Sequence, residues 1–90
     1  MKKKIRISNR LGLHARASSK LVRLTNNFKS DVNISKGELA INAKSILGIL
    51  SLAASLGVEI EIETKGDDEE FAMREVISLF DSKFGEESWA

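Results

Sequence analysis

The plainest secondary-structure signal in the chain is VEIEIE, residues 58–63. Apolar and acidic residues alternate there, which predicts a strand with one buried and one solvated face. Gly66 then ends the strand, and the acidic run DDEE follows at residues 67–70. Negative side chains stabilise the positive end of a helix dipole, so this run predicts a helix start and not a calcium loop. We expect Gly85 to end that helix. Its core face is predicted to consist of Met73, Val76, Ile77, Phe80 and Phe84.

Three shorter runs upstream predict the remaining strands. Residues 31–35 and 38–42 both alternate, and Lys36-Gly37 between them suits a tight hairpin turn. A further alternating run at residues 4–8 predicts the first strand of the chain.

Two helices are predicted between these strands. From Ala15 to about Asn26 apolar residues recur at helical spacing, and Gly12 just ahead of them can adopt a positive φ. Ser45 is a good N-cap for a short helix over residues 46–53. The order β-α-β-β-α-β-α predicts an α+β fold. We expect an open-faced β-sandwich, with three helices on one face of a four-stranded, mostly antiparallel sheet.

Composition excludes several classes of protein. Ninety residues, 42% hydrophobic and 30% charged, predict a single globular domain over residues 1–90. The chain has no cysteine and one histidine, so we expect no disulfide framework, no metal site and no cofactor. No apolar run approaches the roughly 20 residues that span a bilayer. No long apolar stretch follows the basic start as in a signal peptide, so we expect a cytoplasmic protein without membrane insertion.

Charge is divided unevenly along the chain. Residues 1–30 carry nine basic side chains and no acidic one, whereas residues 31–90 have a net charge of −8. The single histidine, His14, lies in the basic part. This distribution favours an anionic ligand or an acidic partner near His14, although basic residues can equally be a solvated face.

The helix predicted over residues 46–53 is apolar around more than half of its circumference, which exceeds a single buried stripe. We therefore expect Ile46, Leu47 and Leu50 to be exposed and to form a partner surface. Gly48 costs about 1 kcal/mol relative to alanine in a helix interior, and it permits close approach of another backbone. The alternative is a helix sunk in the core, for which so small a domain offers little depth.

Residues 12–16, GLHAR, lie at the start of the first predicted helix. There His14 would face unpaired backbone N–H groups and the positive end of the helix dipole, which favours a neutral ring with a free nitrogen. Helix N-termini also bind phosphate, and Arg16 could add a forked contact. The motif alone indicates an anion or phosphoryl site, and a capping or surface histidine is the alternative.

GLHAR followed by a helix resembles the active-site motif of the HPr family, the phosphocarrier proteins of the bacterial phosphotransferase system. Residues 42–52, NAKSILGILSL, are similar to that family's regulatory-serine segment. The resemblance covers essentially the whole chain. It implies that His14 accepts a phosphoryl group on Nδ1 and that Arg16 steadies it. Ala15, Arg16 and Ala17 would form the phosphoryl-binding positions.

The resemblance also implies the partners. The group would come from phosphorylated Enzyme I and pass to Enzyme II A domains, with the chain as a monomeric carrier and not an independent catalyst. Ile46, Leu47 and Leu50 would dock Enzyme I and the HPr kinase. Ser45 would be a regulatory phosphorylation site for HPr kinase/phosphorylase, where a dianion would repel an acidic partner. An unmodified N-cap is the alternative for Ser45.

Ala17 stands where the family normally has proline. Alanine keeps an N–H that proline lacks, so the site is either looser or has an extra donor for the phosphoryl group. The sequence leaves both readings open. It also leaves open a sugar or a nitrogen branch, the downstream acceptor, the presence of a kinase and the role of Trp89.

Two rival functions belong to other classes. A regulatory HPr-like domain of the nitrogen branch or of catabolite control would act through Ser45 and helix 46–53, independently of His14. A small RNA-binding domain is suggested by the basic first third, but the four phenylalanines all fall on predicted helices or their ends. Stacking platforms need exposed rings on strands, so we expect no nucleic-acid partner.

Overall fold

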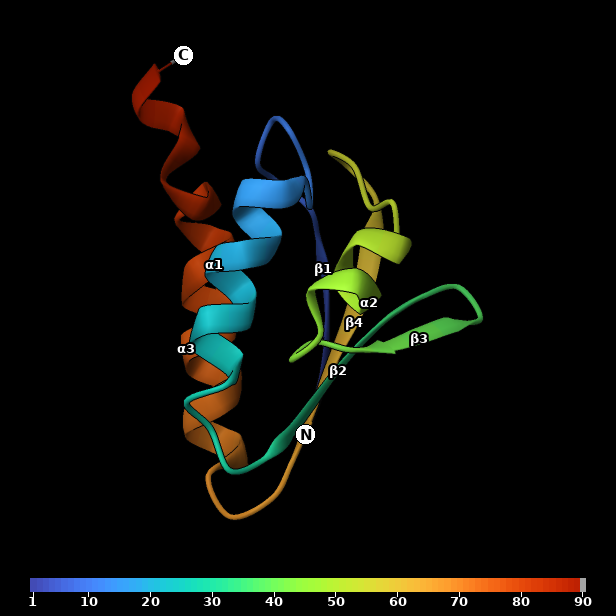
Figure 1. Ribbon diagram of the computed structural model, residues 1–90, viewed down its shortest axis with the longest axis vertical. Coiled ribbons are helices and arrows are strands. Elements are labelled where there is room, and N and C mark those ends of the chain that lie inside the picture. The colour runs from blue at the N-terminus through green and yellow to red at the C-terminus, as the bar shows by residue number, and fades with distance from the viewer. Residues whose placement is uncertain (90) are drawn as a thin grey trace.

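The computed structural model describes the backbone of residues 1–89 and the side chains of residues 1–86. Its order confirms the predicted β-α-β-β-α-β-α arrangement (Figure 1). A 3₁₀ segment, η1, follows the third helix. The elements are β1 (Lys2–Arg6), α1 (Ala15–Thr25), β2 (Asp31–Lys36), β3 (Leu39–Asn42), α2 (Ile46–Ser51), β4 (Glu59–Lys65), α3 (Glu69–Asp81) and η1 (Lys83–Trp89).

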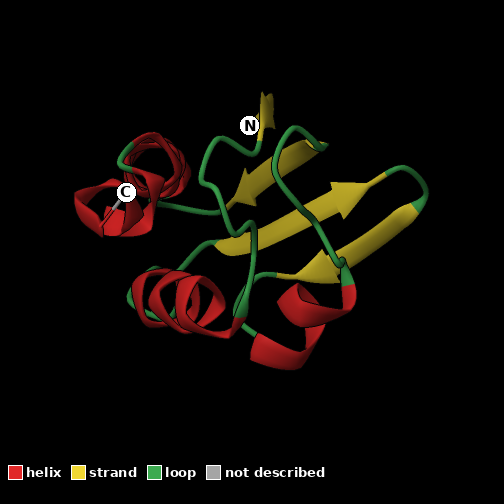
Figure 2. Cartoon of the chain, turned by 90° about the horizontal axis from the view of Figure 1, so that it is seen from above, coloured by secondary structure: helices red, strands yellow, loops and turns green. Residues whose placement is uncertain are grey.

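The sheet is four-stranded and antiparallel throughout, in the order β1-β4-β2-β3. The strand of the VEIEIE stretch, β4, therefore lies inside the sheet and pairs with both β1 and β2. The three helices gather on one side of the sheet (Figure 2), which confirms the predicted open-faced α+β sandwich. Opposite charges face each other across β1 and β4. The pairs are Lys2↔Glu63, Lys4↔Glu61 and Arg6↔Glu59.

The core lies between this sheet and the helices. Ile60 and Ile62 of β4 are buried, as the alternation predicted, because their side chains point toward the helical layer. Leu21, Ile49 and Val76 bring one fully buried side chain from each helix. Both layers thus contribute to one cluster that holds the helix starts in place above the sheet.

The start of α3 uses its acidic residues as predicted, with an added tertiary role. Asp68 occupies the N-cap position but makes no capping bond within its own helix. Its carboxylate instead accepts hydrogen bonds from the Ser30 hydroxyl and from the backbone N–H groups of Lys29 and Ser30. These bonds, that from the Ser30 side chain first, lower the pKa of Asp68 to about 2. The ionised carboxylate therefore ties α3 to the start of β2.

Two helix ends were predicted too late. Helix α2 ends at Ser51 and not near residue 53, because Ala53 turns to a φ of 50° and carries the chain toward Gly12. The third helix ends at Asp81 and not at Gly85. Its C-cap is Ser82, and Lys83 already has a φ of 56°.

Smaller differences concern the strands. The hairpin turn consists of residues 37–38 and not of Lys36-Gly37, since Lys36 still pairs with Leu39. The first strand runs over Lys2–Arg6 and not over residues 4–8, because its pairing with β4 begins at Lys2. The sequence left the role of Trp89 open, and its side chain lies outside those that the structure describes.

Candidate functional site

His14 is the N-cap of α1, in an extended conformation with φ −74° and ψ 179°. Its ring nitrogen Nδ1 accepts a hydrogen bond from the backbone N–H of Arg16 at 3.2 Å. Side-chain oxygens of Ser, Thr, Asp or Asn usually fill this position, and here an imidazole lone pair takes their place. Nδ1 is therefore unprotonated and faces the positive end of the helix dipole.

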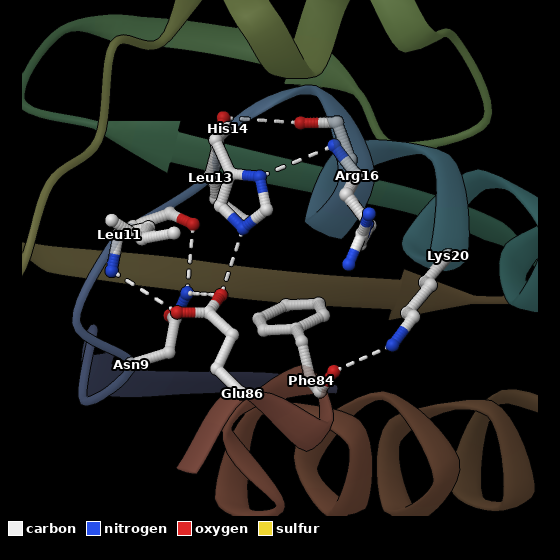
Figure 3. A network of polar contacts seen from close by, with 10 residues as sticks. Asn9, Leu11, Leu13, His14, Arg16, Lys20, Phe84 and Glu86 are labelled. Atoms are coloured by element: carbon white, nitrogen blue, oxygen red, sulfur yellow. Dashed lines mark hydrogen bonds and ion pairs between the residues drawn. The ribbon is translucent and has the colours of Figure 1, made fainter. Parts of the chain in front are cut away.

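The other ring nitrogen, Nε2, lies 2.8 Å from Oε2 of Glu86. A neutral imidazole has one donor and one acceptor nitrogen, so the ring donates from Nε2 while Nδ1 accepts. Figure 3 shows the ring between the start of α1 and Glu86, with each nitrogen facing one of these partners.

Glu86 is held by donors from the loop before His14. Its Oε2 accepts from Asn9 Nδ2 at 2.6 Å, and its Oε1 accepts from the Leu11 N–H at 3.1 Å. Burial of the carboxylate acts to raise its pKa. The hydrogen bonds from His14, Asn9 and Leu11 outweigh that effect and keep the pKa of Glu86 below its usual value. The group is thus an ionised acceptor at neutral pH.

Free donors surround Nδ1 at the helix start. Among the described backbone and side-chain atoms, the backbone N–H groups of Ala15 and Ala17 have no hydrogen-bond acceptor. The Arg16 side chain is exposed, and it makes no ion pair or hydrogen bond with another described residue. Figure 3 places it beside the His14 ring. The structure thus brings together all four site positions predicted on α1, and this arrangement can receive an anionic group next to Nδ1.

The loop before His14 packs closely on the segment after α2. Gly12 has a φ of +66°, as predicted, and a Cβ at this position would lie 2.5 Å from the Ala54 carbonyl oxygen. The N–H of Leu13 donates to that same oxygen at 2.9 Å. This contact fixes where the chain enters α1, and hence where the His14 ring lies.

The second predicted region surrounds α2. Ser45 is its N-cap and accepts from the Gly48 N–H at 3.1 Å, as expected. Ile46, Leu47 and Leu50 are 40%, 76% and 38% exposed, which confirms the predicted apolar surface. The alternative of a helix sunk in the core is wrong.

Sequence reasoning missed several contributors. Leu11 and Leu56 are also exposed apolar side chains, at 47% and 56%, and in the sequence they lie next to the Gly12 and Ala54–Ser55 segments that contact each other. Glu86 and Asn9 were not predicted at all. Seventy-two positions separate Glu86 from His14, and no local spacing links them.

The described residues provide neither a metal site nor a membrane-spanning helix. No group of three or more His, Cys, Asp or Glu side chains among them could hold a metal ion. In the same part of the chain, no helix combines the length and apolar character needed to cross a membrane.

Comparison with known proteins agrees with this geometry. Residues 1–82 match the family model described as "PTS HPr component phosphorylation site". Phosphocarrier protein HPr of Neisseria meningitidis is 48% identical over 86 residues, which cover 96% of this chain and 97% of the relative. Phosphocarrier protein NPr of Shewanella violacea is 39% identical over 98% of this chain and 97% of its own length.

A solved structure extends the likeness to three dimensions. The crystal structure of HPr-C-His from Thermoanaerobacter tengcongensis superposes with a TM-score of 0.92 at 41% identity, covering 96% of this chain and 97% of that one. These matches favour the carrier over the regulatory alternative. The chain belongs to the HPr family, and its role is that of a phosphocarrier in the phosphotransferase system.

Proposed function

We propose that His14 is the residue that carries the phosphoryl group, and that Nδ1 is the atom to which it binds. The observation that supports this most strongly is the hydrogen bond from the Arg16 N–H to Nδ1. It shows a lone pair on the nitrogen that faces the helix start, where free N–H groups can bind the phosphoryl oxygens. Nε2 is engaged with Glu86.

The transfer step needs no proton movement on the ring. The Nδ1 lone pair attacks phosphorus, a P–N bond forms, and the bond from phosphorus to the donor atom breaks with its electron pair left on the donor. The Arg16 guanidinium offsets the charge of the phosphoryl oxygens, and the N–H groups of Ala15 and Ala17 donate hydrogen bonds to them. Because the Ala17 N–H has no acceptor, we assign Ala17 the extra-donor role of the two that the sequence left open.

The partners follow from the family and the surface. We infer that phosphorylated Enzyme I is the donor and that Enzyme II A domains are the acceptors, in the cytoplasm. The apolar residues Ile46, Leu47 and Leu50 would contact them, and the basic residues around His14 would attract acidic surfaces. A monomeric state stays a prediction.

The test is phosphorylation with phosphoenolpyruvate and Enzyme I. We expect acid-labile labelling of the wild type and none of His14→Ala. Labelling that persists in His14→Ala would contradict the assignment. As a control for loss of the fold, Ser19→Ala changes a partly exposed residue of α1 and should be labelled normally.

Ser45 supports a second, regulatory reaction. Its hydroxyl is partly exposed at the edge of the apolar surface, where a phosphate would place charge beside Ile46 and Leu47. We expect HPr kinase/phosphorylase with ATP to label Ser45, and Ser45→Ala to lose the label. Ser51→Ala, on the same helix, is the matched control. Equal labelling of Ser45→Ala would contradict the proposal.

A further inference from the structure

The side chain of Glu86 is only 7% exposed, although it is a carboxylate on the η1 segment. It accepts three hydrogen bonds, from His14 Nε2, Asn9 Nδ2 and Leu11 N–H. Burying an ionised carboxylate costs free energy unless hydrogen-bond donors replace the water molecules that it loses. All three of those partners lie on the segment that ends at the candidate phosphoryl acceptor.

The carboxylate selects one form of the His14 ring. An ionised carboxylate can only accept hydrogen bonds, so the proton must lie on Nε2. With the proton on Nδ1 instead, the Nε2 lone pair would face Oε2 at 2.8 Å, and Nδ1–H would face the Arg16 N–H. Both contacts would be repulsive. Two partners on opposite sides of the ring therefore enforce the same tautomer.

Asn9 holds the Glu86 carboxylate in place through a hydrogen bond. Its side chain is fully buried, and its Nδ2 donates both to Glu86 and to the Gly12 carbonyl oxygen, at 2.6 and 2.8 Å. Among described residues the Asn9 Oδ1 atom has no hydrogen-bond partner, so the side-chain amide acts here only as a donor. The same unit fixes Glu86 and the turn that leads into His14.

From this geometry, and resting on the proposed function, we propose that Glu86 is a positioning residue for phosphoryl transfer at His14. It keeps the Nδ1 lone pair available before transfer. While the phosphoryl group is on Nδ1 and the proton stays on Nε2, the ring carries positive charge, and the carboxylate stabilises it. When the group leaves, the P–N electron pair returns to Nδ1 and the ring is neutral again. The η1 segment therefore contributes a positioning residue to the site.

The test compares Glu86→Gln with Glu70→Gln. Both substitutions remove one negative charge with little change of side-chain shape. Glu70, however, is exposed at the N-terminal end of α3, whereas Glu86 follows the C-terminal end of that helix. With Enzyme I as donor, we expect Glu86→Gln to slow phosphoryl transfer by about 10- to 100-fold, and Glu70→Gln to match the wild type. The circular dichroism spectra show whether both variants are folded.

Nitrogen-15 NMR of the His14 ring gives a readout that a merely structural role would not move. In the unphosphorylated wild type we expect a protonated Nε2 whose hydrogen exchanges slowly, and an unprotonated Nδ1. That protection should disappear in Glu86→Gln. The wild-type spectrum needs no substitution, so it tests the proposal even if the variant is unstable.

Two results would overturn the role of Glu86: transfer at the wild-type rate by Glu86→Gln, or a wild-type ring protonated on Nδ1. The first leaves His14 as the acceptor. Failure of Enzyme I to label the wild type would instead refute the proposed function, so the two failures are distinguishable.

Discussion

Replacing Gly12 with alanine tests how strictly the loop before His14 depends on its contact with Ala54. The added Cβ would lie 2.5 Å from the Ala54 oxygen and 2.8 Å from the Ser55 Cα, and both of these are backbone atoms. Something must therefore move. Gly37→Ala is the matched control, because its φ of +59° is similar but nothing lies within 4 Å of the new Cβ.

The expected magnitudes follow from these two environments. Left-handed backbone costs an alanine roughly 1–2 kcal/mol, and both variants share this term together with the reduced freedom of the unfolded chain. Gly12→Ala also disturbs the hydrogen bond from Leu13 to Ala54, a net contribution of about 1 kcal/mol, and the packing of those two buried residues. We expect Gly12→Ala to lower the free energy of unfolding by about 1–2 kcal/mol more than Gly37→Ala does.

Urea unfolding followed by circular dichroism measures both variants, and transfer from Enzyme I measures the consequence for the site. Gly12→Ala should also slow labelling of His14, because the loop that it displaces leads directly into the ring's position. Gly37→Ala should not. Equal losses of stability in the two variants would refute the close contact, and normal labelling of Gly12→Ala would refute its link to the site.

Three further predictions address other parts of the molecule. Arg16→Ala should slow transfer by about 10-fold or more and leave the urea midpoint unchanged, since its side chain is exposed and makes no ion pair or hydrogen bond with another described residue; an unchanged rate would remove Arg16 from the site. Ala17→Pro removes one free N–H donor, so phosphorylated His14 should lose its group about 2- to 10-fold faster, as followed by phosphorus-31 NMR; slower loss would show that proline tightens the site. The Asp68 carboxylate, with its pKa lowered to about 2, stabilises the fold fully above about pH 4, and this contribution is lost as the pH falls toward 2. The stability gap between the wild type and Asp68→Asn should therefore close over that range, and a gap independent of pH would contradict the role of the ionised carboxylate.

Local patterns predicted those features that depend on a few neighbouring residues. The alternation in residues 58–63 identified β4, and the apolar excess around α2 identified the exposed Ile46, Leu47 and Leu50. Both signals arise because a strand or helix can bury only one face. The position of His14 at a helix start followed in the same way from the change of period at Ala15.

Features set by distant contacts were not predictable. Helix α2 ends early because Ala54 must reach Gly12, which lies more than forty positions away in the sequence. Asp68 binds the Ser30 segment and not its own helix. Glu86 reaches His14 only because α3 returns the chain to the start of α1. No periodicity in a single sequence encodes such pairings, since they depend on how the layers pack.

The most direct test of the central claim is the location of the phosphorus atom. The nitrogen-15-labelled protein, phosphorylated by Enzyme I and phosphoenolpyruvate, would be examined by NMR for coupling between phosphorus and the ring nitrogens. We predict one phosphoryl group, coupled to Nδ1 of His14, with Nε2 still protonated. Phosphorus on Nε2, or on any other residue, would contradict the account.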